Sequence, residues 1–253
     1  FSWQTSETDG PGTVTFDVVV TNSSNAGLTD RKTVSVQVAE VNSPPTLNPI
    51  NDTSVEASTA LSFAVTSADP DIPANTLSYA IDSASAAKGM AINTGTGAFT
   101  WTPTSAHAGT HPITVTATDD GNPSLSDTFT FSVEVTLSIT LDMIGDQSIS
   151  ENSLLTFSAS ATVPGESAPP VYSLEGAVPN GASIDPSTGV FSWTTDESDG
   201  PGSYVFDVVA TRSDNAAVTD RETISIGVFE SNSPPALNPI NDTSVEASTA
   251  LSF

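Results

Sequence analysis

The chain has 253 residues, of which 30 are acidic and five are basic, for a net charge of −25. Such a charge repels nucleic acid and anionic membranes and attracts cations, so we expect neither nucleic acid nor a membrane as a partner of this segment. Cysteine is absent, which excludes disulfides, thiolate catalysis and Cys-ligated zinc.

The sequence repeats itself at an offset of 190 residues. Residues 1–63 return at 191–253, and positions 47–63 are identical to 237–253. This period exceeds the roughly 20 to 50 residues of solenoid units, so the repeat must consist of whole modules. Phe-Ser-Trp or Phe-Thr-Trp ends at Trp3, Trp101 and Trp193, which divides each long repeat into two homologous modules. We predict the C-terminal part of one module (1–40), two complete modules (41–136 and 137–230) and the N-terminal part of the next (231–253).

Short alternating segments predict the fold class. Apolar residues, which make up 37% of the chain, alternate strictly with polar ones over 33–38, 128–135 and 223–228. Alternation of this kind indicates half-buried strands, and no stretch shows a sustained helical period. About seven strands in roughly 95 residues predict an all-β module, a two-sheet β-sandwich with the Trp in its core.

Acidic motifs in 41–136 resemble those of a known family. Asp69-Pro-Asp71, followed by Asn75 and later by Ala-Thr-Asp119, resembles the Ala-x-Asp-x-Asp-x-x-x-Asn and Ala-x-Asp segments of cadherin repeats, and the preceding Glu40-Val-Asn42-Ser-Pro resembles the cadherin linker. The segment 184–193, Ile-Asp-Pro-Ser-Thr-Gly-Val-Phe-Ser-Trp, resembles dystroglycan-type cadherin-like and Ig-like modules of prokaryotic surface proteins. The resemblance covers the whole chain and implies tandem Greek-key β-sandwiches in an extended extracellular array.

The same resemblance implies calcium at the junctions between modules. Calcium takes 6 to 8 oxygen ligands, which a module, a linker and the next module can supply together. In cadherins the preceding module contributes a Glu and an acidic cluster. The matching donors are Glu7 and Asp9 in the first piece, and Glu151, Glu197 and Asp196 or Asp199 in the third. The matching linker residues are Glu40, Asn42, Glu230 and Asn232, and the receiving acids are Asp69, Asp71 and Asp119.

The two module types differ in these residues. Module 137–230 has Thr-Val-Pro-Gly-Glu over 162–166 where the Asp pair is expected, and Arg212 in the position of Asp119. Its linker, 136–140, carries no acid, and the donor cluster of module 41–136 reads Thr-Ser-Ala-His over 104–107. We therefore expect calcium near Glu40 and near Glu230 but not near Thr136. The alternative is that these acids are solvated loop charges that cap turns.

Other polar residues offer less chemistry. His107 and His111 are interpreted as exposed polar residues rather than a zinc pair. Asp30-Arg31 and Asp220-Arg221 are interpreted as exposed pairs at strand starts, which contribute little stability. No Gly-x-Ser-x-Gly motif or Ser/His/Asp arrangement is visible, and catalysis would need an element unique to one unit. We therefore expect no enzyme activity.

The sequence thus predicts a non-enzymatic extracellular structural or adhesive repeat region on the cell surface, either an adhesin stalk or a fibre component. Its expected partners are neighbouring repeats, other copies in a fibre, and a surface glycan or protein bound outside this segment. The alternatives are a carbohydrate- or protein-binding β-sandwich and an accessory region of a larger secreted enzyme. The end pieces would have open strand edges, completed by further chain or by strand addition from another copy.

Overall fold

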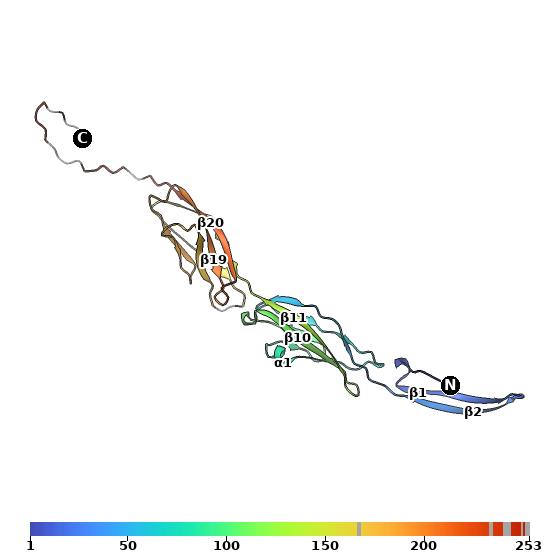
Figure 1. Cartoon of the computed structure of the whole chain (residues 1–253). Coiled ribbons are helices and arrows are strands. Elements are labelled where there is room, and N and C mark those ends of the chain that lie inside the picture. Colours follow the sequence, from blue (N-terminus) through green and yellow to red (C-terminus); the bar gives the residue numbers. More distant parts are fainter. Residues whose placement is uncertain (166–167, 233–234, 240–243, 249, 251–253) are drawn as a thin grey trace. The chain divides into compact units, whose positions relative to one another are not determined.

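The computed structural model describes residues 1–165, 168–232, 235–239, 244–248 and 250. These residues form strands almost throughout (Figure 1), which confirms the all-β prediction. The described helices are three single turns, η1 (Glu7–Asp9), α1 (Ser83–Ala86) and η2 (Ser105–His107), and none could span a membrane.

Contacts divide the chain into two compact units. The first contains Phe1–Thr140 with Thr162–Pro169 and Arg212–Thr219, and the second contains Leu141–Ala161, Pro170–Thr211 and Asp220–Phe253. The module boundaries inferred from the sequence repeat are a separate division and stay a prediction.

The first unit opens with an antiparallel hairpin of β1 (Gly12–Asn22) and β2 (Asn25–Val38), seen in Figure 1. Its cross-strand contacts correct the prediction that Asp30 and Arg31 pair with each other. The Arg31 guanidinium instead lies 2.8 Å from Asp17, which also accepts a hydrogen bond from the Thr33 hydroxyl at 2.7 Å. Thr33 lies directly across from Asp17, and Arg31 lies diagonally across from it on the same face of the hairpin, whereas sequence neighbours such as Asp30 and Arg31 point to opposite faces.

Residues 41–136 of the first unit form a β-sandwich. One sheet has the order β4-β11-β10-β7, a second has β5-β9-β8, and β3 pairs with β6. The strands are β3 (Thr46–Leu47), β4 (Thr53–Glu56), β5 (Leu61–Ala64), β6 (Ser67–Ala68), β7 (Ser78–Ile81), β8 (Ala91–Ile92), β9 (Ala98–Trp101), β10 (Gly109–Thr118) and β11 (Ser126–Thr136). There are nine strands rather than about seven, because three of them have two residues and no alternation to detect.

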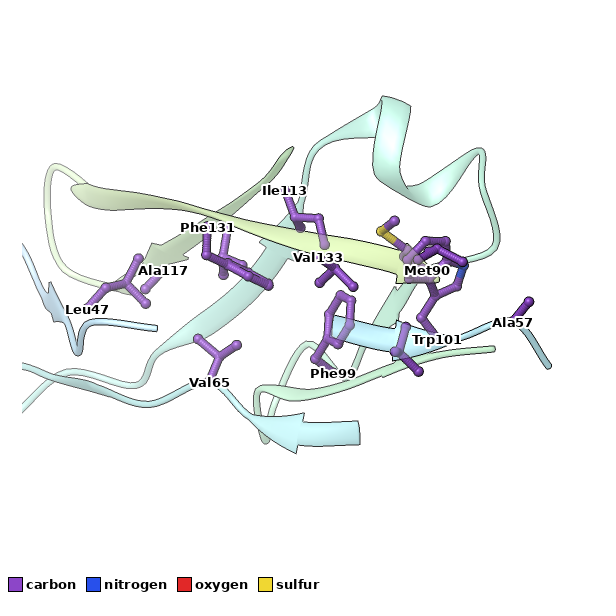
Figure 2. Close-up of a cluster of buried hydrophobic side chains, with 13 residues drawn as sticks. Leu47, Ala57, Val65, Met90, Phe99, Trp101, Ile113, Ala117, Phe131 and Val133 are labelled. Atoms are coloured by element: carbon purple, nitrogen blue, oxygen red, sulfur yellow. The ribbon is translucent and has the colours of Figure 1, made fainter. Parts of the chain in front are cut away.

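Aromatic rings from both sheets fill this sandwich. Phe99 on β9 and Phe131 on β11 converge between the strands (Figure 2), with ring centroids 6.1 Å apart in an edge-on arrangement. Trp101 is 2% exposed and its indole N–H donates to the Lys88 carbonyl at 3.1 Å, which confirms that the Trp lies in the core. Burying each such side chain contributes about 1.5 to 3 kcal/mol.

The strands between Thr140 and Phe229 form a second β-sandwich of the same kind. Its sheets have the orders β13-β20-β19-β16 and β14-β18-β17, and β12 pairs with β15. The strands are β12 (Thr140–Leu141), β13 (Gln147–Ser150), β14 (Leu154–Ser158), β15 (Ala161–Thr162), β16 (Val171–Gly176), β17 (Ser183–Ile184), β18 (Val190–Thr194), β19 (Gly202–Thr211) and β20 (Thr219–Phe229). Trp193 is fully buried and meets Tyr204 edge-on, with ring centroids 4.9 Å apart. Arg221 again pairs across strands, with Glu175 at 3.0 Å and Asp207 at 3.4 Å, and not with Asp220.

The two histidines are half-buried, so the prediction of exposed polar residues was wrong. The ring centroids of His107 and His111 lie 5.6 and 5.3 Å from that of Trp101 in edge-on arrangements. Nδ1 of His111 lies 2.9 Å from the Lys88 ammonium, and its Nε2 lies 2.6 Å from the His107 carbonyl oxygen. Both rings thus lie against the buried Trp, and hydrogen bonds occupy both ring nitrogens of His111.

Within 231–253, the described residues form no strand, although 237–253 copies the segment that holds β3, β4 and β5. Each of those strands pairs with a partner later in the chain: β3 with β6, β4 with β11, and β5 with β9. Residues 231–253 contain no equivalent of these partners, which explains why the described residues 244–246 form no strand although they repeat residues 54–56 of β4.

Candidate metal-binding site

Three carboxylates gather in the first unit, and we call Glu7, Glu40 and Asp71 the Glu40 cluster. One oxygen from each lies within 4.8 Å of the others. Glu7 begins η1, Glu40 follows β2, and Asp71 lies in the loop between β6 and β7. Glu7 and Glu40 are exposed, whereas Asp71 is 3% exposed. The cluster thus joins Glu7 of the first piece, Glu40 of the linker and Asp71 of the next module. The sequence motifs indicated all three residues.

The electrostatics of this cluster favour a cation. Partial desolvation raises the pKa of Glu40, and the negative charges of Glu7 and Asp71 raise it further. Like charges at this distance oppose ionisation, and a cation among them reverses the sign of the interaction.

Hydrogen bonds hold the loop that carries Asp69 and Asp71 in place. Some side-chain oxygens in and beside this loop have no hydrogen-bond partner among the described residues. The Ser43 amide donates to both carboxylate oxygens of Asp71 at 3.2 and 3.1 Å. Asp69 uses Oδ1 to accept from the Asp71 and Asn75 amides at 3.2 and 3.0 Å. Its Oδ2, and the Oδ1 atoms of Asn42 and Asn75, are buried without a hydrogen-bond partner in the described residues. Such atoms are uncommon in folded proteins and call for an explanation.

Asp119, the third predicted receiving acid, is buried and contacts Asn42. It is 4% exposed, and its Oδ1 accepts from the Leu125 and Gly121 amides at 2.9 and 3.1 Å, while the Asn42 amide nitrogen donates to its Oδ2 at 3.0 Å. Burial raises the pKa of Asp119, but the hydrogen bonds from Leu125, Asn42 and Gly121 outweigh it, so the net shift is downward. Asp119 therefore stays ionised and orients Asn42.

A second group, the Glu230 cluster, consists of Glu151, Glu197 and Glu230 in the second unit, again with oxygens within 4.8 Å of one another. Glu151 is 2% exposed; its Oε2 accepts from the Ser231 amide at 3.3 Å, and its Oε1 is buried without a partner in the described residues. Gly200 makes room for it, because a Cβ there would lie 2.4 Å from Oε1. Among the described residues, no further group of three or more such ligands occurs, including near Thr136.

The two clusters correspond through the 190-residue repeat. Glu7 and Glu40 become Glu197 and Glu230, but the third members differ, Asp71 in one and Glu151 in the other. Two of the three positions are therefore shared. Together the two clusters use four positions of the repeat, those of Glu7, Glu40, Asp71 and Glu151.

Several predicted residues lie outside both clusters. Asp9 accepts from the amide and hydroxyl of Ser6, at 2.7 and 2.9 Å, and Asn232 is exposed. Asp196 and Asp199 accept from backbone amides of their own turn at 2.8 and 2.7 Å, as the alternative of turn-capping acids predicts. The sequence motifs did not single out Asn75 and Gly200 as site residues, although Asn75 is part of the quoted cadherin pattern and Gly200 precedes a proline in the acidic turn.

Comparison with known proteins places this arrangement in a family. The family model described as Putative Ig domain matches residues 44–136 and again 137–227. The chain belongs to this family. Its two Ig domains follow each other directly in the sequence, as expected for cadherin-like and Ig-like tandem repeats, and no curated protein matches the chain.

Solved structures similar to these Ig domains are cadherin ectodomains. They include the protocadherin GammaB4 extracellular domain (16% identity, 88% of this chain and 40% of that chain, TM-score 0.44) and Drosophila N-cadherin EC1-4 (22%, 86% and 59%, 0.38). Mouse cadherin-23 EC22-24 matches at 17% identity over 90% of this chain and 78% of that chain, with a TM-score of 0.44. The chain thus spans two fifths and about three fifths of the first two structures.

Proposed function

We propose that this chain is a non-enzymatic spacer segment of an extracellular surface protein, a stalk or fibre component, in which calcium stiffens the junctions at Glu40 and Glu230. The mechanism is mechanical. In a tandem array each domain contacts its neighbours only, so length scales with repeat number and stiffness depends on the junctions.

The observation that carries the proposal is the Glu40 cluster, in which three carboxylates meet within 4.8 Å beside three buried oxygens without a hydrogen-bond partner. Oxygen donors of this kind, carboxylates together with side-chain amides, are what calcium prefers. The donor set fits the ion in its chemistry.

Each residue has a distinct role in this proposal. Glu7, Glu40 and Asp71 supply negative charge, while Asp69, Asn42 and Asn75 offer the remaining oxygens. Calcium would supply the positive charge that offsets their repulsion. The hydrogen bonds from Ser43 to Asp71 and from Asn42 to Asp119 hold the receiving loop in place before the ion binds. Binding requires ionised carboxylates, so affinity falls as pH falls.

Hydrogen–deuterium exchange of the 253-residue chain, with calcium or with a chelator, tests this function. We expect calcium to slow exchange in peptides covering 40–44 and 69–76, and in those covering 151–153 and 228–232. Magnesium, which demands octahedral geometry and dehydrates reluctantly, is the control and should give little protection. Equal exchange with and without millimolar calcium in all four segments contradicts the proposal.

A further inference from the structure

Arg212 is a fully enclosed cation. It follows β19, is 1% exposed, and its Nη1 donates to the carbonyl oxygens of Ser138 and Pro164 at 2.8 and 3.0 Å. Its Nε and Nη2 donate to the two carboxylate oxygens of Asp214, both at 2.8 Å. A buried charge is tolerated only when it is paired and hydrogen-bonded, and here three separate segments meet that requirement.

These three segments correspond to the linker and the two acidic loops that carry Asn42, Asp71 and Asp119. The Arg212 amide donates to Val218 and the Asp119 amide donates to Leu125, both at 3.0 Å, so Arg212 and Asp119 are equivalent. The amides of Leu47 and Leu141 both donate to an aspartate, Asp127 or Asp220, which makes the linker residue Ser138 equivalent to Pro44.

Equivalent hydrogen bonds also show which residue of the first sandwich corresponds to Pro164. The Asn48 amide donates to Thr66 and the Asp142 amide donates to Ser160, at 2.9 and 2.8 Å. Counting from these bonds, Pro164 is equivalent to Pro70, which lies between Asp69 and Asp71.

We propose that the Arg212 guanidinium is a built-in cation among the loops around Ser138, Pro164 and Asp214. It takes the place that the proposed function, on which this comparison rests, assigns to calcium among the equivalent loops around Asn42, Asp71 and Asp119. The linker 136–140 is thereby held by a side chain of the protein itself. Its integrity does not depend on the calcium concentration.

Around Arg212, small residues stand at two positions that carry carboxylates in the two acidic clusters. Gly165 is equivalent to Asp71. Ala57 is equivalent to Glu151, since their amides donate to the equivalent carbonyls of Thr136 and Phe229, both at 3.0 Å. A Cβ on Gly165 would lie 3.0 Å from the Ala57 Cβ and 2.9 Å from the Ser58 hydroxyl. Backbone and small side chains thus lie where the two equivalent positions carry carboxylates.

The chain itself contains a natural control for the ion pair. Residues 22–25 read Asn-Ser-Ser-Asn, whereas their repeats at 212–215 read Arg-Ser-Asp-Asn. Arg212 and Asp214 thus correspond to two uncharged residues, Asn22 and Ser24, so the two charges are present or absent together. The double variant Arg212→Asn with Asp214→Ser installs a sequence that already occurs in the same strand connection.

The first test needs no variant. In hydrogen–deuterium exchange of the wild-type 253-residue chain, peptides covering 138–140, 162–165 and 212–218 should exchange equally with calcium and with a chelator. Calcium-dependent protection of these peptides would overturn the proposal. The result is separable from the proposed function, which concerns peptides 40–44 and 69–76: either set can respond without the other.

The second test is chemical rescue. Arg212→Gly should lower the melting temperature by about 10 °C, because Asp214 and two carbonyls lose their buried partner. Guanidinium at 5 mM should recover at least half of that loss, while urea, of the same shape but neutral, should recover none. Equal rescue by urea, or rescue by calcium alone, would contradict the role of a built-in guanidinium. If Arg212→Gly does not fold, the Arg212→Asn/Asp214→Ser variant is used: its exchange over 138–140 should rise at least fivefold, and unchanged exchange would overturn the proposal.

Discussion

Arg212 occupies in the second sandwich the position that Asp119 occupies in the first, since each amide donates at 3.0 Å to the carbonyl six residues further on. One backbone geometry thus presents an anion in one copy and a cation in the other. The anion orients Asn42 beside the Glu40 cluster, and the cation joins its own three loops directly.

Replacing Asp71 by Asn should abolish the calcium response of the first unit. At a calcium concentration 100 times Kd, binding stabilises the folded state by about 2.7 kcal/mol, and this gain should be lost because Asp71 is the buried carboxylate of its cluster. Urea denaturation with and without calcium measures it.

The matched control for Asp71→Asn is Glu134→Gln, which removes one charge from the exposed face of β11 outside the cluster. This variant should keep the full calcium response. A similar loss in both variants would mean that net charge, and not the cluster, governs the response.

The pKa of Glu40 should lie above its ordinary value of 4.5 in the calcium-free chain and fall when calcium is added. A raised pKa means that the folded state holds this proton more tightly than the unfolded state. Its contribution to stability is therefore present at low pH and is lost as pH rises through the pKa of the folded state. Glu40→Gln should accordingly raise the melting temperature of the calcium-free chain at pH 7 and remove the benefit of calcium. NMR titration of the Glu40 carboxyl carbon, with a pKa at or below 4.5, would refute this.

Asp185 should make the second sandwich sensitive to acid. Hydrogen bonds from the side chain and amide of Ser187 and the amide of Thr188 lower its pKa to about 2. Since the folded-state pKa lies below 3.8, the stabilisation is complete above pH 3.8 and is lost as pH falls toward 2.

Asn93 provides the reference for Asp185, because its Oδ1 accepts from Gly95 and Thr96 in the equivalent turn without a charge. Asp185→Asn should therefore flatten the dependence of melting temperature on pH between 4 and 2. An unchanged slope in that variant would assign the acid sensitivity to other carboxylates.

Gly97→Ala should destabilise the first sandwich by about 3 kcal/mol or more, because Gly97 has φ +68° and a Cβ there would lie 2.2 Å from the Val65 carbonyl oxygen. Gly95→Ala, two residues earlier in the same turn, meets nothing closer than 3.8 Å and should change stability by less than about 1 kcal/mol. Denaturant unfolding of both variants compares them, and equal effects would contradict the steric argument.

Local sequence patterns predicted the fold class and three acidic residues that the structure brings together. Alternation over 128–135 defines β11, and the cadherin-like motifs singled out Glu7, Glu40 and Asp71, which the fold brings within 4.8 Å. These signals are local, because a strand's period and a loop's acids are written in consecutive residues. Ion pairs could not be predicted from such local signals. Arg31 contacts Asp17 and not Asp30, because Arg31 and Asp17 lie diagonally across the hairpin on one face, whereas neighbours in sequence point to opposite faces.

Tertiary structure also decided which acids form the clusters and which cap turns. Asp9 and Glu7 are two residues apart in one acidic turn, yet only Glu7 joins the cluster, whereas Asp9 accepts hydrogen bonds from Ser6. The sequence marked Arg212 only as the loss of an acid. Its positive role became visible when Ser138 and Pro164, 74 and 48 residues away, were found to converge on its guanidinium. A side chain's partners are set by the folded backbone, and chain order does not specify them.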